Sequence, residues 1–196
     1  MNEQDNVMVK YNWLFERLGS RSEAILSFKR FLESETSWLT APASTRFHLN
    51  KEQGLLEHSV GVTYNALELK AKLAPDITDE SIIVTALFHD VGKVGYPGKP
   101  YYLPNDNQWE VEKRGMRYKV NPEIVTLNIA VRSLYLISSH IPLTEFEMQA
   151  IAAHDGVYPT YGGVVNLEYF HRECRLQMIV HFADKWTAAV DEENRK

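Results

Sequence analysis

Three side chains of metal-binding types occupy inward-facing positions on three separate predicted helices: His58, His89 and Asp184. Each lies within or beside a helical stripe of apolar residues. An unsatisfied polar group on such a face costs about 1–3 kcal/mol, so a single buried histidine is usually a core residue with a satisfied hydrogen bond. Three such residues favour a different arrangement, in which the side chains converge on a cation.

Asp90 offers a fourth ligand directly after His89. Neighbouring residues point apart on a helix, so both can reach one ion only where the helix ends, which Gly92 permits. Imidazole and carboxylate together suit a divalent metal ion, with Mn, Fe, Ni, Co, Zn or Mg as candidates. Four protein ligands leave room for water, and a metal lowers the pKa of bound water enough to supply hydroxide near neutral pH. The pattern predicts hydrolysis by metal-activated water.

Helices must position these residues, and hydrophobic periodicity predicts helices over most of the chain. The expected helices span residues 7–19, 21–34, 54–74, 78–89, 122–140, 143–156 and 168–190. Thr144 and Glu147 have the spacing of a capping box at one helix start. Irregular connections are expected at 37–54 and 160–170.

One segment interrupts this helical pattern. Residues 94–120 contain three prolines and an alternating stretch centred on Gly115. The alternation predicts a β-hairpin with strands at about 109–113 and 116–120. The expected fold class is therefore all-α, a helical bundle with a small β-hairpin insertion near residues 109–120.

The chain has 196 residues, of which 44% are apolar and 24% charged, as is ordinary for a globular domain. No repeat or long linker divides it. We expect a single domain over residues 1–196, with N-terminal helices in 1–43 and a core in 44–190.

Cys174 is the only cysteine, which excludes an intrachain disulfide and a cysteine-rich zinc site. A reduced, cytoplasmic setting is expected. The first residues, "MNEQDNVMVKYNW", do not have the pattern of a signal peptide. No stretch approaches the roughly 20 apolar residues that span a bilayer, so no membrane partner is expected.

Charge is distributed unevenly along a chain whose net charge is −5. Residues 91–120 carry six basic and three acidic side chains, while the rest of the chain is acidic. A local positive field on an acidic protein suits a small anionic substrate better than a stable nucleic-acid partner, although chance drift in composition would give the same count. Association into a homo-oligomer is compatible with this composition.

Four motifs follow one another along the chain: "LLEHS" with His58, "LFHDVGK" with His89, Asp90 and Lys93, "AIAAHDG" with His154, and "VHFADKW" with Asp184. In this order they resemble the HD superfamily of metal-dependent phosphohydrolases, over about residues 44–190. The stretches "APASTRFHLNKEQGLLEHS" and "SLYLISSHIPLTEFEMQAIAAHDG" further resemble a bacterial and phage subgroup, related to the HD domains of certain 3′–5′ exoribonucleases.

The resemblance implies a role for each matching residue. The metal ligands would be His58, His89, Asp90 and Asp184. The catalytic residues would be Asp90, Lys93 and His154. Lys93 would hold a substrate phosphate, for which its compact charge is suited, and His48 would line the phosphate pocket. His154 matches a histidine that helps to bind a second ion in two-metal members, and it could instead be a general acid or an orienting residue.

One feature of the two-metal members is missing from this chain. They usually have another histidine in a "GH" early in the helix before the capping box, where this chain has "TLNIAVRSLYLI". A single metal ion is therefore favoured, and a second would depend on His154 and Asp90. Three further histidines are expected to be ordinary surface or loop residues: His140, His171 and His181.

The predicted hairpin would emerge close to Lys93. Four basic residues could clamp a phosphate: Lys113, Arg114, Arg117 and Lys119. Four aromatic residues could stack on a base: Tyr101, Tyr102, Trp109 and Tyr118. The same alternation of arginine and aromatic residues is also typical of a solvated hairpin. Arg132 is a further candidate phosphate contact.

The sequence thus predicts a metal-dependent phosphohydrolase that acts on the phosphate ester or anhydride of a nucleotide. Two alternatives stay open. One is a phosphodiesterase acting on RNA or DNA 3′ ends or on cyclic nucleotides. The other is a non-catalytic HD module that binds a nucleotide, which the missing second-metal histidine permits and the complete set of four ligands opposes.

Overall fold

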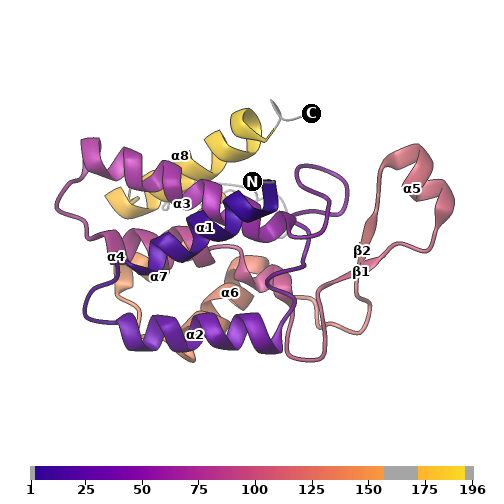
Figure 1. Cartoon of the computed structure of the whole chain (residues 1–196), viewed down its shortest axis with the longest axis horizontal. Coiled ribbons are helices and arrows are strands. Elements are labelled where there is room, and N and C mark those ends of the chain that lie inside the picture. The colour runs from indigo at the N-terminus through magenta and orange to yellow at the C-terminus, as the bar shows by residue number, and fades with distance from the viewer. Residues whose placement is uncertain (1–2, 157–171, 193–196) are drawn as a thin grey trace.

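Helices form most of the structure, a computed structural model that describes residues 3–156 and 172–192. In chain order the elements are α1 (Glu3–Phe15), α2 (Ser22–Glu35), α3 (Gly54–Leu73), α4 (Asp79–Ile82), η1 (Ile83–Leu87), η2 (Val91–Val94), β1 (Tyr102–Pro104), α5 (Gln108–Arg114), β2 (Tyr118–Val120), α6 (Ile129–Ser138), α7 (Glu145–Ala152), α8 (Arg175–Trp186) and η4 (Thr187–Asp191). Figure 1 shows a helical body from which β1, α5 and β2 project as an arm. The predicted fold class, mostly helical with one small hairpin, is confirmed.

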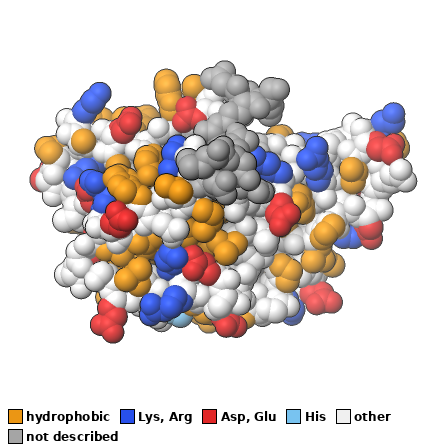
Figure 2. All heavy atoms as spheres, viewed as in Figure 1, with side chains coloured by type: hydrophobic (Ala, Val, Ile, Leu, Met, Phe, Trp, Pro, Cys, Tyr) orange, Lys and Arg blue, Asp and Glu red, His pale blue; other side chains and the backbone are white. Residues whose placement is uncertain are grey.

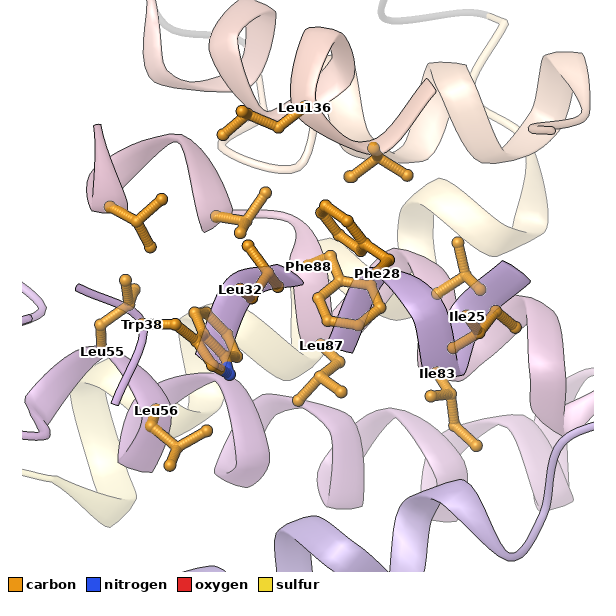
Figure 3. Packing of buried hydrophobic residues seen from close by; sticks show 14 of the residues in the cluster. Ile25, Phe28, Leu32, Trp38, Leu55, Leu56, Ile83, Leu87, Phe88 and Leu136 are labelled. Carbon is orange, nitrogen blue, oxygen red and sulfur yellow. The ribbon is translucent and has the colours of Figure 1, made fainter. Parts of the chain in front are cut away.

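The larger of two hydrophobic clusters packs α2 against η1 and α6. Ile25, Phe28 and Leu32 recur at helical spacing on α2, and all three are fully buried. The rings of Phe28 and Phe88 meet edge to face with their centroids 5.0 Å apart (Figure 3). Trp38 closes this cluster from the connection that follows α2, so the N-terminal helices share a core with the rest of the chain.

The smaller hydrophobic cluster joins α3, η1 and α8. Several of its members are small: Val62 and Ala66 on α3, Ala86 on η1, and Val180 and Ala183 on α8. Small side chains allow helices to approach closely. These three elements hold or directly precede the predicted metal ligands, and their close packing brings those ligands together.

The arm corrects one part of the sequence prediction. β1 and β2 pair in antiparallel register, with Tyr102 opposite Val120. The strand expected at 116–120 is confirmed in its last three residues, whereas the strand expected at 109–113 is wrong because these residues lie in the helix α5.

Capping explains why that segment is helical. The side chain of Asn107 accepts a hydrogen bond from the main-chain N–H of Glu110, which caps the start of α5. Gly115 ends the helix with a φ of 65°, a conformation that glycine adopts without steric cost. α5 buries none of its residues, so these local signals decide its conformation without help from a core.

Two helices begin later than predicted. α6 starts at Ile129, where the Asn128 side chain accepts hydrogen bonds from the N–H groups of the first turn, so the expected helical residues before it are not helical. α8 starts at Arg175, after Cys174, whose sulfur accepts from the N–H of Gln177. The expected start at 168–171 and the loop expected at 160–170 lie outside the described residues.

Two further expectations concern helix ends and membranes. The capping box at Thr144 and Glu147 is present at the start of α7. Across the described ranges, each helix is either too short or too polar to cross a bilayer.

Candidate metal centre

The four predicted metal ligands meet in the interior of the protein. His58 lies on α3 and Asp184 on α8, while His89 and Asp90 follow η1. His58 Nε2 is 3.1 Å from Asp184 Oδ1 and 4.0 Å from Asp90 Oδ2. His89 Nε2 is 3.9 Å and 3.5 Å from the same two oxygens. Ligand atoms held at right angles by bonds of about 2.1 Å are about 3 Å apart, so these distances are close to those around one ion.

A helix end allows His89 and Asp90 to face the same point. η1 is a π-helix, and the residue after it, Phe88, has already left helical geometry with a φ of −110°. His89 and Asp90 then lie in a turn before η2. π-turns are rare and occur often at functional sites, where they change which side chains point inward.

Three imidazoles share one hydrogen-bond pattern. For each, the Nδ1 atom lies 2.7 or 2.8 Å from an oxygen: Glu192 Oε1 for His58, the Ala86 carbonyl for His89 and the Ile151 carbonyl for His154. A carbonyl can only accept, so Nδ1 of His89 and of His154 carries the hydrogen and Nε2 is left to bind a metal; an ionised Glu192 requires the same of His58. Nε2 of His89 is buried and has no hydrogen-bond partner within the described structure, as expected for a metal ligand.

The surrounding charges stabilise a cation. Burial alone would lower the pKa of His58, but the carboxylates of Asp184 and Glu192 raise it to about 10. Burial would raise the pKa of Asp184, yet its hydrogen bond to His58 and the charge of His89 hold it far below its usual range. The donor set, its charge and the unpartnered His89 nitrogen therefore fit a divalent metal ion.

Lys93 stands beside the centre as a fixed positive charge. Its Nζ is 2.5 Å from Asp90 Oδ2. Burial alone would lower the pKa of Lys93, but the charge of Asp90 raises it above its usual value. The same ion pair outweighs burial for Asp90 and holds the pKa of that carboxyl well below its ordinary range.

His154 lies on the other side of Asp90. His154 Nε2 is 3.7 Å from Asp90 Oδ1, whereas the second carboxylate oxygen faces Lys93 and His89. His89, Asp90 and His154 also place one ligand atom each within 4.8 Å of one another. A second ion held by His154 stays a prediction.

Two further residues, His48 and Glu192, lie beside His58. The ring of His48 lies 5.2 Å from that of His58, and its buried Nε2 has no hydrogen-bond partner among the described atoms. Glu192, which accepts from His58, was not predicted. Glu192 follows Asp184 by eight residues, so in a regular helix its side chain would point about 80° away from that of Asp184. The π-helix η4 brings the two side chains closer to one face, and no sequence pattern marks this π-helix.

The three predicted arginines lie in different places. Arg114 and Arg117 are exposed on the arm, where Arg114 pairs with Glu110 at 3.4 Å. Arg132 is fully buried, and its guanidinium donates to the carbonyls of Gly92 at 3.2 Å and Val125 at 2.9 Å. Arg132 thus supports the chain beside Lys93, and its role as a substrate contact stays a prediction.

The arm approaches the centre through Tyr102 of β1. The pKa of the Tyr102 hydroxyl is raised to about 12, mainly by burial. The charge of Lys93 lowers this pKa, and the charge of Asp90 raises it. Tyr102 is therefore close enough to both groups to interact with them electrostatically.

The other histidines lie apart from the metal ligands where they are described. His140 packs against the rings of Phe28 and Phe31 at 5.1 and 4.6 Å. His181 Nδ1 hydrogen-bonds the carbonyl of His154 at 2.6 Å, so it supports the segment that holds His154. His171 lies outside the described residues.

The helical fold and the buried cluster of histidine and aspartate beside a lysine are those of a metal-dependent hydrolase. The family model of the HD domain matches residues 55–189, more than half of the chain, so the protein belongs to the HD domain family. HD domains are metal-dependent phosphohydrolases. No curated protein and no solved structure matches the chain.

Proposed function

We propose that this protein hydrolyses a phosphate ester or anhydride bond of a nucleotide, with His58, His89, Asp90 and Asp184 holding one divalent metal ion. The observation that supports it most is that Nε2 of both His58 and His89 lies within 4.0 Å of an oxygen of Asp90 and of Asp184, with the Lys93 ammonium 2.5 Å from Asp90. A bound divalent ion supplies a Lewis acid that lowers the pKa of water and neutralises phosphoryl oxygens.

The residues around the ligands then have separate tasks. Lys93 offers N–H donors and a positive charge to a phosphoryl oxygen, where charge develops during hydrolysis. His154 is a candidate to orient the substrate or attacking water, because its Nε2 lone pair faces the centre while Nδ1–H donates to the carbonyl of Ile151. To protonate the leaving oxygen it would first have to take up a proton on Nε2. His48 has an unpartnered buried nitrogen that a phosphate oxygen or a water molecule would satisfy.

Charge and shape favour a small substrate with a phosphate and an aromatic group. On the face shown in Figure 2, basic and acidic side chains are interspersed over the body and the arm, which does not favour a long polyanion there. The basic segment 91–120 supplies both Lys93 and the arm. The charge of Lys93 acts on the Tyr102 hydroxyl, so Tyr102 is a candidate to stack on the base of a nucleotide whose phosphate binds Lys93.

The test compares the wild-type protein with Asp184→Asn after elemental analysis of both. Each protein is assayed, with the metal found, against nucleoside monophosphates and triphosphates, cyclic dinucleotides and a labelled RNA oligomer. We expect turnover of a nucleotide by the wild type and loss of both metal and turnover in Asp184→Asn. Asp76→Asn, a change in an exposed carboxylate paired with Arg175, is the matched control and should behave as wild type.

Other outcomes would change the assignment. If only the cyclic dinucleotide or the RNA 3′ end is cleaved, the protein is a phosphodiesterase. Stoichiometric nucleotide binding without turnover in the presence of metal would indicate a binding module. Full activity in Asp184→Asn would contradict the proposed metal centre itself.

A further inference from the structure

Glu192 is a buried acid outside the part of the chain that the HD domain model matches. Only 5% of it is exposed. Its Oε1 lies 2.7 Å from Nδ1 of His58, which is itself 1% exposed. Its other oxygen, Oε2, has no hydrogen-bond partner in the described structure. Burying a carboxylate with one oxygen unpaired costs free energy. A buried acid of this kind needs an explanation, and its contact with His58 offers one.

The contact has a direct consequence for His58. An ionised carboxylate can only accept a hydrogen bond, so Nδ1 of His58 keeps its hydrogen, and Nε2 is the nitrogen that gives up its proton when a metal ion binds. Nε2 is the atom that lies 3.1 Å from Asp184 Oδ1 at the centre. Carboxylates that bind the far nitrogen of a ligating histidine fix the tautomer and the ring orientation, and they make the ligand more basic.

The backbone is shaped to bring Glu192 to this position. In a regular helix, Glu192 would lie about 80° around the axis from Asp184. The π-helix η4 inserts about one extra residue into the turn, with the N–H of Glu192 bonded to the carbonyl of Thr187, and so returns Glu192 toward the Asp184 face.

α3 holds this π-turn in place. The Asn65 amide donates to Thr187 Oγ1 and to Asp191 Oδ2, each at 2.8 Å, and so ties both ends of η4 to the helix that carries His58. Gly61 on the same helix allows the close approach, because a Cβ there would stand 3.0 Å from the methyl group of Thr187. The turn that delivers Glu192 is therefore fixed to the element that delivers His58.

We propose that Glu192 is a positioning residue of the metal centre, which accepts the Nδ1–H of His58 and directs Nε2 toward the ion. This inference rests on the proposed metal centre. It assigns to Glu192 the task of fixing the orientation and protonation of His58, which the four ligands do not do for themselves.

The test measures metal affinity by competition with a chelator for the wild type, Glu192→Ala, Glu192→Gln and Asp191→Asn. We expect Glu192→Ala to bind metal about 10–100-fold more weakly. Glu192→Gln should fall between it and wild type, because its amide oxygen still accepts the N–H without the charge. Asp191→Asn removes a carboxylate from the same turn while keeping an oxygen for Asn65, so its affinity should match that of the wild type.

A second readout separates positioning from simple structural support. In ¹⁵N spectra of the zinc-loaded protein, His58 should show Nε2 bound to metal and Nδ1 protonated, and the hydrogen-bond shift of the Nδ1–H signal should be smaller in Glu192→Gln and lost in Glu192→Ala. Unchanged affinity in Glu192→Ala, or an equal loss in Asp191→Asn, would overturn the inference alone. A wild-type protein that binds no metal would overturn the proposed function and the inference together.

Discussion

At the scale of single residues, Lys93 adds to the metal ligands a positive charge that can bind a phosphoryl oxygen. A metal site alone would not need this charge. The Lys93 side chain is 16% exposed, whereas that of His89 is fully buried, and the Lys93 ammonium contacts the ligand Asp90. The ion pair with Asp90 keeps Lys93 positively charged despite its burial. A phosphoryl oxygen that approaches the centre would meet this charge.

Lys93→Met should therefore separate binding of metal from turnover. We expect kcat/KM to fall about 10²–10³-fold, the usual effect of removing one donor to a developing oxyanion. Metal affinity should stay the same or rise, because Asp90 loses a competing cation. Kinetics and elemental analysis of the same preparation measure both effects. The control is Lys72→Met, an exposed lysine on α3, and equal kcat/KM in the two variants would contradict the role of Lys93.

The sequence predicted much of the residue-level picture. His58, His89 and Asp184 were identified because each interrupts an apolar stripe, and the structure places all three in one cluster. Glu192 was not identified, since its alignment with Asp184 depends on a π-turn and on the Asn65 contact, which no local sequence pattern marks. Residues that support a ligand through a rearranged backbone are the hardest to predict.

At the scale of elements, the contact between η2 and α6 fixes the segment that carries Asp90 and Lys93. Gly92 donates its N–H to Ser133 Oγ at 2.8 Å. A Cβ on Gly92 would lie 2.4 Å from the carbonyl oxygen of Ile129, closer than real contacts allow. The helix whose end Gly92 is expected to permit already ends before His89, and Gly92 instead lies within η2 as a point of close approach to α6.

Gly92→Ala should consequently harm both folding and activity. We expect a loss of about 1–3 kcal/mol in the free energy of unfolding, typical of overpacking against backbone. Activity should fall further than stability explains, because relief of the clash moves Asp90 and Lys93. Urea unfolding and steady-state kinetics measure the two effects. Val131→Ala, on the exposed side of α6, should change stability by less than about 0.5 kcal/mol.

Element boundaries show where local sequence misleads. Trp109 and Val111 alternate with polar residues as in a strand, yet the caps at Asn107 and Gly115 make α5 a helix. Propensity and alternation are weak signals where no core selects between them, and α5 buries none of its residues. On α7, by contrast, the capping box fixes the start close to the predicted one, although the helix expected to reach Gly156 ends at Ala152.

At the scale of the whole molecule, one arginine ties the N-terminal helices to the HD domain. Arg21 lies just before α2, outside the matched residues 55–189. Its guanidinium donates to Glu147 Oε1 at 2.6 Å and Oε2 at 2.8 Å, and to Glu80 Oε1 at 3.0 Å. Glu147 is fully buried, so Arg21 neutralises a carboxylate that would otherwise be unpaired in the interior.

Arg21→Ala should be strongly destabilising near neutral pH. Removing one partner of a buried ion pair costs about 3–5 kcal/mol, because the remaining charge is left uncompensated. The control is Arg175→Ala, which removes an equally well-formed but exposed pair with Asp76 and should cost no more than about 1 kcal/mol. The free energy of unfolding, measured with urea for each variant, tests the difference.

The pH dependence of that loss follows from the two carboxyl groups. Burial would raise the pKa of Glu147 and of Glu80, but the hydrogen bonds and charge of Arg21 hold both below the usual value. A folded-state pKa below the unfolded value of about 4.3 gives stabilisation that is complete above that pH and is lost as the pH falls through the folded-state pKa. The difference between wild type and Arg21→Ala should therefore be largest at neutral pH and shrink as the pH falls to about 4 and below, beginning when Glu147 of the variant, whose pKa burial raises once Arg21 is gone, takes up a proton. A difference that stays constant between these pH values would show that Arg21 acts through packing, and that its charge does not join the N-terminal helices to the HD domain.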